Sequence, residues 1–398
     1  MGTGRVDRIY AGSRLRIGKQ KWFQELQVNR YNVIDSLTKK IWSDSDEQGM
    51  LGHTLSTHLA YALDKKVRRE AASGGATSAL LIHALERKFI DGAIVCKSFI
   101  DNGRVRARFE IARSREEILS AQGSKYVETK FLKEVLPLLR DNHGKYAVCG
   151  LPCDISNLKR WEEKEPELES KVALRVSFLC GHNSRKELID GITRKLQKEQ
   201  GAEKNLTVFK FRTGHWRGDL EARYDDDTTV KKRFSYFSDY RNLSFFCEKK
   251  CTACIDHFGF QADISFGDVW LYSLKNNPLK HGCVVIRSSR GQKLFNQAIE
   301  CNALESTQVE RRLILDGQSR IAPTHYDITA RSKAAKLLGA NIPDKLKLKT
   351  STIKVLSSFI GLFNMKISEG KFSNFIFLAP RPMIRGYLYI KKGLETLA

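Results

Sequence analysis

The 398-residue sequence has little proline, no long apolar run and no leader-like start, and each shortage excludes a class of protein. With 8 prolines and 28 glycines, the chain is neither collagen-like nor of low complexity. Its longest uncharged apolar stretches, VLSSFIGLFNM and FSNFIFLAP, are shorter than the roughly 20 residues that a membrane-spanning helix needs. No apolar segment follows the basic start MGTGRVDRIYAGSRLRIG, so we expect no signal peptide and a cytoplasmic protein with reduced thiols.

Apolar residues and positive charge are what the chain has in quantity. It is 41% hydrophobic and 10% aromatic, enough to bury a core, and its length suggests about two or three domains. The formal net charge of +23 attracts anions, whether nucleic acid, acidic lipid, an acidic protein or a polyanionic small molecule. Residues 331–398 hold 13 Lys and Arg against 3 Asp and Glu. That tail is either a docking surface or an ordinary solvated face.

Apolar periodicity predicts alternating strands and helices between residues 57 and 199. We expect strands at DGAIVCK, KYAVCG and KVALRVSFLC, and helices at ATSALLIHALERK, KFLKEVLPLLRD, GLPCDISNLKRW and SRKELIDGITRKLQKE. This order predicts an α/β fold with a mainly parallel sheet flanked by helices, a β-rich insertion and a basic helical C-terminal tail. The predicted parts are an N-terminal extension (1–53), an α/β part (54–200), a β-rich, Cys-containing part (201–320) and the tail (321–398).

The first candidate binding feature is the run Ser73, Gly74, Gly75, which precedes Thr77 at the start of a predicted helix. Glycines let the backbone approach a ligand closely, and the free N–H groups of a helix start attract phosphate or another anion. The alternative is an ordinary capped helix start.

Four cysteines form the second candidate feature. Cys153 begins a helix directly after a strand, where the helix N-terminus favours thiolate, and Cys180 ends the next strand. If these strands are parallel, both cysteines emerge at the same carboxyl edge of the sheet. Cys251 and Cys254 form a C-x2-C pair, but no second pair completes a compact zinc site. The four together would instead suit an iron–sulfur cluster, with Cys247 as a fifth candidate.

Several blocks occur in the order found in the coenzyme F420 hydrogenase/dehydrogenase beta subunit family, which the chain resembles over roughly residues 54–298. The blocks are AASGGATSALLIHALE with IDGAIVCK, QGSKY, GLPCD, VSFLCGH, CTACIDHFGFQADISFGDVW and GCVVIRSSRG. Asp154 stands where the family usually has Gln, and Cys283 replaces a small polar residue. No cysteine precedes Cys96, so the N-terminal ferredoxin-like module of many members is not expected.

The resemblance implies an iron–sulfur flavoprotein that holds FAD beside one 4Fe–4S cluster. It implies Cys153, Cys180, Cys251 and Cys254 as cluster ligands. The cofactor-binding residues that it implies are Ser73, Gly74, Gly75, Thr77, Gly123, Ser124, Lys125, Tyr126, Asp263 and Asp268. Lys125 would contact the flavin pyrophosphate or an acidic substrate; the alternative is a solvated surface lysine. For Asp263 and Asp268, the alternative is a structural role in turns and helix capping.

The functional hypothesis is therefore an oxidoreductase that passes electrons between a hydride substrate, coenzyme F420 or another small molecule, and a one-electron partner. The positive field favours an acidic carrier such as a ferredoxin, or a partner subunit. We expect no nucleic acid, and the basic tail allows peripheral membrane contact. Two rival hypotheses remain open: a zinc-stabilised binding protein for nucleic acid or acidic glycan, and a non-redox accessory subunit in polysaccharide biosynthesis.

Overall fold

The computed structural model describes residues 42–201, 204–215, 217–371 and 373–397. Most of the predicted N-terminal extension, residues 1–41, lies outside the described residues. Its described part forms helix α3 (Asp44–Leu51), which begins at Ser43, because that hydroxyl accepts a hydrogen bond from the Asp46 backbone N–H. The helix buries Met50 and Leu51 against the sheet described next.

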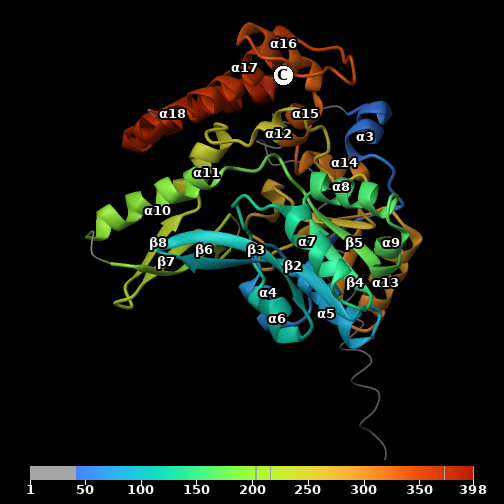
Figure 1. Cartoon of the computed structure of the whole chain (residues 1–398). Helices are drawn as coiled ribbons and strands as arrows, with labels where there is room; N and C mark the ends of the chain where they lie inside the picture. The colour runs from blue at the N-terminus through green and yellow to red at the C-terminus, as the bar shows by residue number, and fades with distance from the viewer. Residues whose placement is uncertain (1–41, 202–203, 216, 372, 398) are drawn as a thin grey trace, which may run out of the picture.

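The body is built on one eight-stranded sheet in the order β11-β1-β10-β9-β5-β4-β2-β3 (Figure 1). Its core, β2, β4, β5 and β9, is parallel, and the strands outside this core pair antiparallel. The predicted α/β class is thus confirmed, with a mixed sheet around a parallel centre. The strands are β1 (Ser56–Ala62), β2 (Gly92–Asp101), β3 (Arg104–Ala112), β4 (Tyr146–Gly150), β5 (Val172–Phe178), β9 (Ile264–Asp268), β10 (Gly282–Ile286) and β11 (Leu304–Gln308).

Helices cover both faces of the sheet because its central strands are apolar on both sides. Alternate residues of β4 show this: Ala147 and Cys149 pack in the core with α5 and α13, while Tyr146 and Val148 pack with α7, α8 and α9. These helices are α5 (Ala76–Glu86), α7 (Phe131–Arg140), α8 (Pro152–Glu162), α9 (Pro166–Lys171) and α13 (Ser289–Glu300). Short α4 (Lys65–Glu70) and α6 (Arg115–Ser120) flank α5 (Figure 1).

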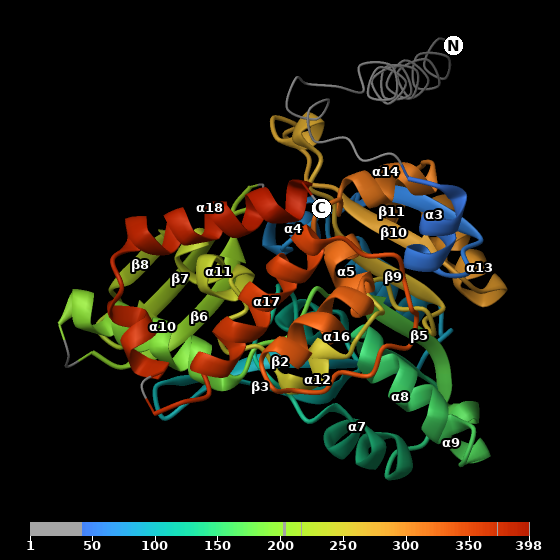
Figure 2. The same ribbon diagram turned by 90° about the horizontal axis from the view of Figure 1, so that it is seen from above.

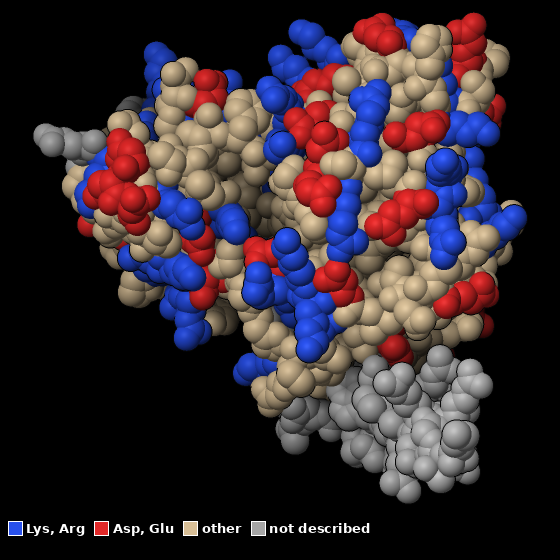
Figure 3. Space-filling view, turned by 90° about the horizontal axis from the view of Figure 1, so that it is seen from below, with Lys and Arg blue, Asp and Glu red and all other residues tan. Residues whose placement is uncertain are grey.

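The predicted β-rich insertion is a separate antiparallel sheet of three strands. It consists of β6 (Leu206–Thr213), β7 (Asp219–Tyr224) and β8 (Thr229–Arg233), and it shares a second core with α10 (Lys186–Gln200) and α11 (Ser235–Asn242). Seen from below, the molecule is hollowed between this lobe and the main body, with Lys and Arg side chains around the hollow (Figure 3).

The predicted C-terminal tail is helical and lies across one end of the molecule (Figures 1 and 2). It follows α14 (Arg311–Asp316) and comprises α15 (Ile321–Tyr326), α16 (Ile328–Leu337), α17 (Thr352–Ile367), the 3-10 turn η2 (Ser373–Leu378) and α18 (Arg381–Leu397). The tail packs against the small lobe, which consists of the three-stranded sheet with α10 and α11. Its Phe377, Ile384 and Leu388 lie in the core of that lobe. In the described part of the chain, no helix has the length and apolar character to cross a membrane.

Candidate functional site

The parallel centre of the sheet brings the predicted site segments to one edge. β4 and β5 pair in parallel, so Cys153, in the first turn of α8 after β4, and Cys180, in the loop after β5, lie at the same carboxyl edge of the sheet, as predicted. A cavity of about 300 Å³ opens there, within the size range of small-molecule sites. Nine predicted cofactor residues line it: Ser73, Gly74, Gly75, Thr77, Gly123, Ser124, Lys125, Tyr126 and Asp268.

The glycine run forms a tight backbone cradle at the start of α5. Gly75 has φ +79°, a left-handed conformation that favours glycine. A Cβ on Gly74 would lie 2.7 Å from the Ala60 carbonyl oxygen and 2.8 Å from that of Lys280, so the backbone here admits no side chain. No side chain caps α5, and its first N–H groups remain available to a ligand.

Asp268, at the end of β9, ties the glycine loop to the small lobe. Its carboxylate accepts a hydrogen bond from the Ser73 hydroxyl and lies 2.5 Å from the Arg212 guanidinium, which is only 3% exposed. Arg212 also donates to the Ala72 carbonyl oxygen (3.2 Å) and lies over the Trp270 ring. Sequence reasoning missed Arg212, since it comes from the distant strand β6 and no local motif marks it.

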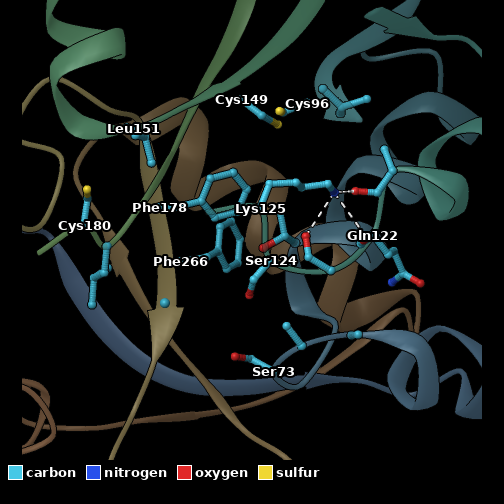
Figure 4. Close-up of a pocket in the computed structure, with 18 of the residues that line it drawn as sticks. Ser73, Cys96, Gln122, Ser124, Lys125, Cys149, Leu151, Phe178, Cys180 and Phe266 are labelled. Carbon is cyan, nitrogen blue, oxygen red and sulfur yellow. Dashed lines mark hydrogen bonds between the residues drawn. The ribbon is translucent and has the colours of Figure 1, made fainter. Parts of the chain in front are cut away.

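Lys125 holds the second loop of the cavity in place. Its ammonium group donates to the carbonyl oxygens of Ala121, Gln122 and Gly123, as the dashed lines in Figure 4 show. These three acceptors match the three hydrogens of the group. Burial lowers the pKa of Lys125 to about 8. The structure therefore gives Lys125 a positioning role in this loop.

Aromatic and sulfur-bearing side chains form the remaining wall. The Phe178 and Phe266 rings, from β5 and β9, lie in the middle of the view in Figure 4, with Cys96 and Cys149 beyond them. Arg241, from α11, lines the cavity too and lies 5.1 Å from the centre of the Tyr126 ring. These residues were not predicted, although Phe178 ends a core strand, a position that could have indicated a place at the ligand-binding edge of the sheet.

Asp263 lies apart from the cavity, at the opposite end of β9. Its carboxylate accepts from the Arg175 backbone N–H (2.7 Å) and from the Arg290 side chain (2.7 Å). Arg175 pairs in turn with the buried Glu162. The structure thus places Asp263 in a buried ionic group that joins β5, β9 and α13.

The four candidate cysteines come together from three segments. Cys180 lines the cavity, and its backbone N–H donates to the His257 carbonyl oxygen (3.0 Å), which joins it to the chain after the C-x2-C pair. That pair lies in and after α12 (Lys249–Thr252), where the Asn183 backbone N–H donates to the Cys251 sulfur (3.3 Å). No group of three or more His, Cys, Asp or Glu side chains among the described residues closes around a single metal ion.

The protonation of these thiols follows burial more than helix geometry. Burial, then the Asp154 carboxylate, raises the pKa of Cys153, and both oppose the thiolate stabilisation expected from the helix N-terminus. Burial also raises the pKa of Cys254 to about 11, and neighbouring thiols of the group add to both shifts. Cys251 differs, because a hydrogen bond with Cys247 lowers its pKa. Cys247 is therefore a direct neighbour of the group.

Two family models match the body of the chain. Residues 57–136 match the model for the N-terminal part of the coenzyme F420 hydrogenase/dehydrogenase beta subunit. Residues 143–312 match the model for the C-terminal part of the same beta subunit. The matched segments hold the cavity-lining loops and all four candidate cysteines, while the tail lies outside them.

Individual relatives agree with these matches. The chain is similar to the coenzyme F420 hydrogenase subunit beta of Methanococcus voltae, 25% identical over 63% of this chain and 83% of that protein. The protein of the same name from Methanosarcina barkeri is 25% identical over 66% and 85%.

A solved structure shares the fold. It is a chain of the F420-reducing [NiFe] hydrogenase complex from Methanosarcina barkeri, with a TM-score of 0.54 and 20% identity over 77% of this chain and 99% of that one. Because the two family models together cover more than half of the sequence, the chain belongs to the coenzyme F420 hydrogenase/dehydrogenase beta subunit family.

Proposed function

We propose that the protein is an iron–sulfur flavoprotein oxidoreductase, which passes electrons between a hydride substrate and a one-electron partner. Membership of the family implies a redox function. The observation that carries the finer proposal is that Cys180 belongs both to the cavity wall and to the group of four thiols. A flavin in the cavity and a cluster on those thiols would therefore be neighbours, as transfer of single electrons requires.

The cavity supports FAD as its occupant. Backbone N–H groups at the glycine-rich start of α5 suit a pyrophosphate, and the phenyl rings of Phe178 and Phe266 suit a flat apolar ring system. The Oε1 atom of Gln122 and the Nε atom of Arg241 are buried at the cavity without a hydrogen-bond partner. Unsatisfied polar atoms of this kind are what a bound polar ligand would satisfy.

The thiol group supports a 4Fe–4S cluster on Cys153, Cys180, Cys251 and Cys254. Cys153 and Cys180 each have their pKa raised first by burial and then in part by the other thiols, which places the sulfurs within electrostatic range of one another. A cluster binds one thiolate at each iron, so its ligands surround a cage instead of a single ion. Cys247 would support Cys251 by its hydrogen bond and need not be a ligand.

The chain's own residues would position and shield the reactants. Ser73, Asp268 and Arg212 hold the glycine loop against the small lobe, and Lys125 fixes the facing loop. The two phenyl rings exclude water from the middle of the cavity. Bound FAD would supply the chemistry, exchanging a hydride with the substrate and single electrons with the cluster. Asp263 would act at a distance, by fixing β9.

The names of the relatives suggest the partners. Coenzyme F420 is the substrate that we propose first, because the curated relatives are named for it. A partner subunit or an acidic ferredoxin would take the electrons, drawn by the net charge of +23. The similar chain belongs to a hydrogenase complex, which supports assembly with other subunits.

The outward face of the tail supports a contact with anionic lipid. Along α17, Ile353, Leu356, Phe363 and Ile367 are exposed at helical spacing. α17 itself carries Lys354 and Lys366 and no acidic residue, and residues 331–398 hold 13 basic and 3 acidic residues. Apolar side chains set among lysines suit an anionic bilayer surface. A second copy of the chain is a less suitable partner for this face, because two basic faces would repel each other.

The decisive test of the redox proposal is purification of the full chain without oxygen. We expect flavin absorption bands, a broad shoulder bleached by dithionite, and stoichiometric iron and acid-labile sulfide. Cys254→Ser should lose the iron, while Cys301→Ser, at an exposed cysteine outside the group, should keep it. A colourless protein would refute the proposal; zinc in it would favour the metal-binding rival, and no metal would favour an accessory subunit.

A further inference from the structure

A second cavity, of about 120 Å³, lies between the family-matched body and the tail. The body contributes residues around α11 and α12, and the tail contributes α15 and the inner sides of α17 and α18. Figure 2 shows α18 running across the side of α11 and the three-stranded sheet, with α16 and α17 beside α12. Its polar and sulfur-bearing lining includes His182, Arg241, Cys247, Cys251, Arg320, His325, Arg331, Ser357, Ser358, Lys391 and Glu395.

The cavity has an excess of positive charge. Four of its lining side chains are cationic, and Glu395 is its single carboxylate. Glu395 pairs with Arg320 (2.7 Å) and with Lys391. The other two guanidinium groups donate to carbonyl oxygens: Arg241 to that of His182, and Arg331 to those of Thr324 and Cys254.

Several polar atoms around this cavity are buried without a hydrogen-bond partner. They include the Nε atom of Arg331, Nε2 of His325 and Oγ of Ser357, whereas the Nε atom of Arg241 is shared with the large cavity, which Arg241 also lines. Arg331 is 8% exposed, His325 5% and Ser357 3%, so water does not reach them freely. Buried donors without an acceptor keep the full cost of their desolvation. A concentration of them around one cavity indicates a missing acceptor.

The orientation of α17 agrees with a polar occupant. An ordinary surface helix buries its apolar side and exposes its polar side. Here the buried residues are Ser357, Ser358, Asn364 and one apolar residue, Leu362, while Leu356 and Phe363 are exposed. The two serines face the cavity, which explains why the helix turns its polar side inward.

The geometry points to a binding site for a small oxyanion of the phosphate class in this cavity. Guanidinium groups bind such oxyanions through paired N–H donors, and the serine hydroxyl and lysine add further donors. The volume admits a single phosphate group. The site adjoins the proposed cluster through Cys251, which lines this cavity, whereas Cys153, Cys180 and Cys254 do not line it. An anion bound here would fasten the tail to the body.

Thermal unfolding of the full chain tests the site. Phosphate should raise the Tm in a concentration-dependent way, whereas chloride at matched ionic strength should not. Arg331→Gln should weaken phosphate binding about tenfold or more, since a charged hydrogen-bonding partner is lost. The matched control is Arg385→Gln, an exposed arginine of the same tail that does not line the cavity, and it should bind like the parent.

Two further measurements keep the proposal falsifiable if Arg331→Gln does not fold. Ser357→Ala is a milder change that removes one donor, and isothermal titration should show several-fold weaker phosphate binding. Phosphate assay and mass spectrometry after denaturation would distinguish free phosphate from a phosphorylated metabolite as the resident source. Equal Tm shifts with phosphate and chloride in the parent protein, or unchanged affinity in both variants, would overturn the proposal.

Discussion

The body and the tail differ in how their charged groups are paired and in which side chains their helices bury. In the body, the charged groups at the large cavity are bonded to one another or to loop carbonyls, as Asp268 is to Arg212 and Lys125 is to its loop. Under the tail, Arg331 and Ser357 keep unpartnered atoms around a smaller cavity. The helices differ likewise: α7 buries Phe131, Val135, Leu136 and Leu139, whereas α17 buries serines and exposes a phenyl ring. The loops of the large cavity are therefore held by bonded charged groups, although the Oε1 atom of Gln122 and the Nε atom of Arg241 at that cavity have no partner, like the atoms of Arg331 and Ser357 under the tail.

Breaking the Asp268–Arg212 pair should have the largest effect on the body. Asp268→Ala leaves a guanidinium that is 3% exposed without its carboxylate, so the free energy of unfolding should fall by about 3 kcal/mol. Denaturant unfolding measures this loss. Glu169→Ala, which removes an exposed surface pair with Lys159, is the control and should cost less than about 0.5 kcal/mol. Equal losses would show that the pair is not structural.

A side chain at Gly74 should lower the free energy of unfolding somewhat less than Asp268→Ala does, but it should abolish flavin binding. Gly74→Ala places a Cβ against two backbone carbonyl oxygens that cannot easily move, at a cost of about 1–3 kcal/mol. Absorbance of the purified protein and its unfolding curve report the two effects. Gly386→Ala, in α18 with open space around it, should stabilise by up to about 1 kcal/mol. Retention of flavin by Gly74→Ala would contradict the proposed cradle.

Lys125 should give the body a pH-dependent stability. Its pKa is about 8 in the folded protein against an ordinary 10.5, so between these values the unfolded chain binds the proton that the folded chain has released. The free energy of unfolding should therefore rise from pH 8 to 10.5, by on the order of 2 kcal/mol, with no contribution to the slope below pH 8. Lys125→Met should remove this rise, and Lys65→Met, at an exposed lysine, should not. A parent curve parallel to that of Lys125→Met would refute the assignment.

The outward face of the tail should tolerate change with the smallest effect on stability. Combined Leu356→Glu and Phe363→Glu should alter the free energy of unfolding by less than about 0.5 kcal/mol, because both side chains are already exposed. Flotation with vesicles that contain phosphatidylserine should nevertheless show loss of binding, and each removed lysine should weaken it about fivefold. Leu55→Glu, at an exposed leucine of the body, is the control. Absence of vesicle binding by the parent chain would exclude lipid and favour a protein partner.

Strong local patterns were enough to predict much of the fold. The runs that became β4 and β5 are continuous and apolar, and the helix between them begins with proline at its first position. β1, β3 and β11 were not predicted. β3 alternates arginines with small or apolar residues, and its place in the sheet depends on pairing with β2. Such edge pairing is a long-range contact that no local window contains.

The residues of the candidate site likewise fall into those that local motifs predicted and those that depend on long-range contacts. Loop motifs marked the residues that use their backbone, such as Gly74 and Gly123, because unusual conformations restrict the amino acids that fit. They did not mark Arg212, Arg241 or Phe266, whose importance comes from where separate elements meet. Asp263 shares a motif with Asp268 but lies at the opposite end of the strand and does not line the cavity, a difference that the motif alone does not reveal.

The sequence by itself determined the α/β class, the helical basic tail and the loops at the sheet edge, because these depend on local periodicity and backbone conformation. Only the tertiary structure decided which side chains meet. It placed Cys180 in the wall of the large cavity, beside the other candidate thiols. It directed the Lys125 ammonium group to the carbonyl oxygens of its own loop, and it turned the serines of α17 toward a cationic cavity. Those outcomes depend on burial and on pairing between segments far apart in the chain, where desolvation decides which charges need a partner.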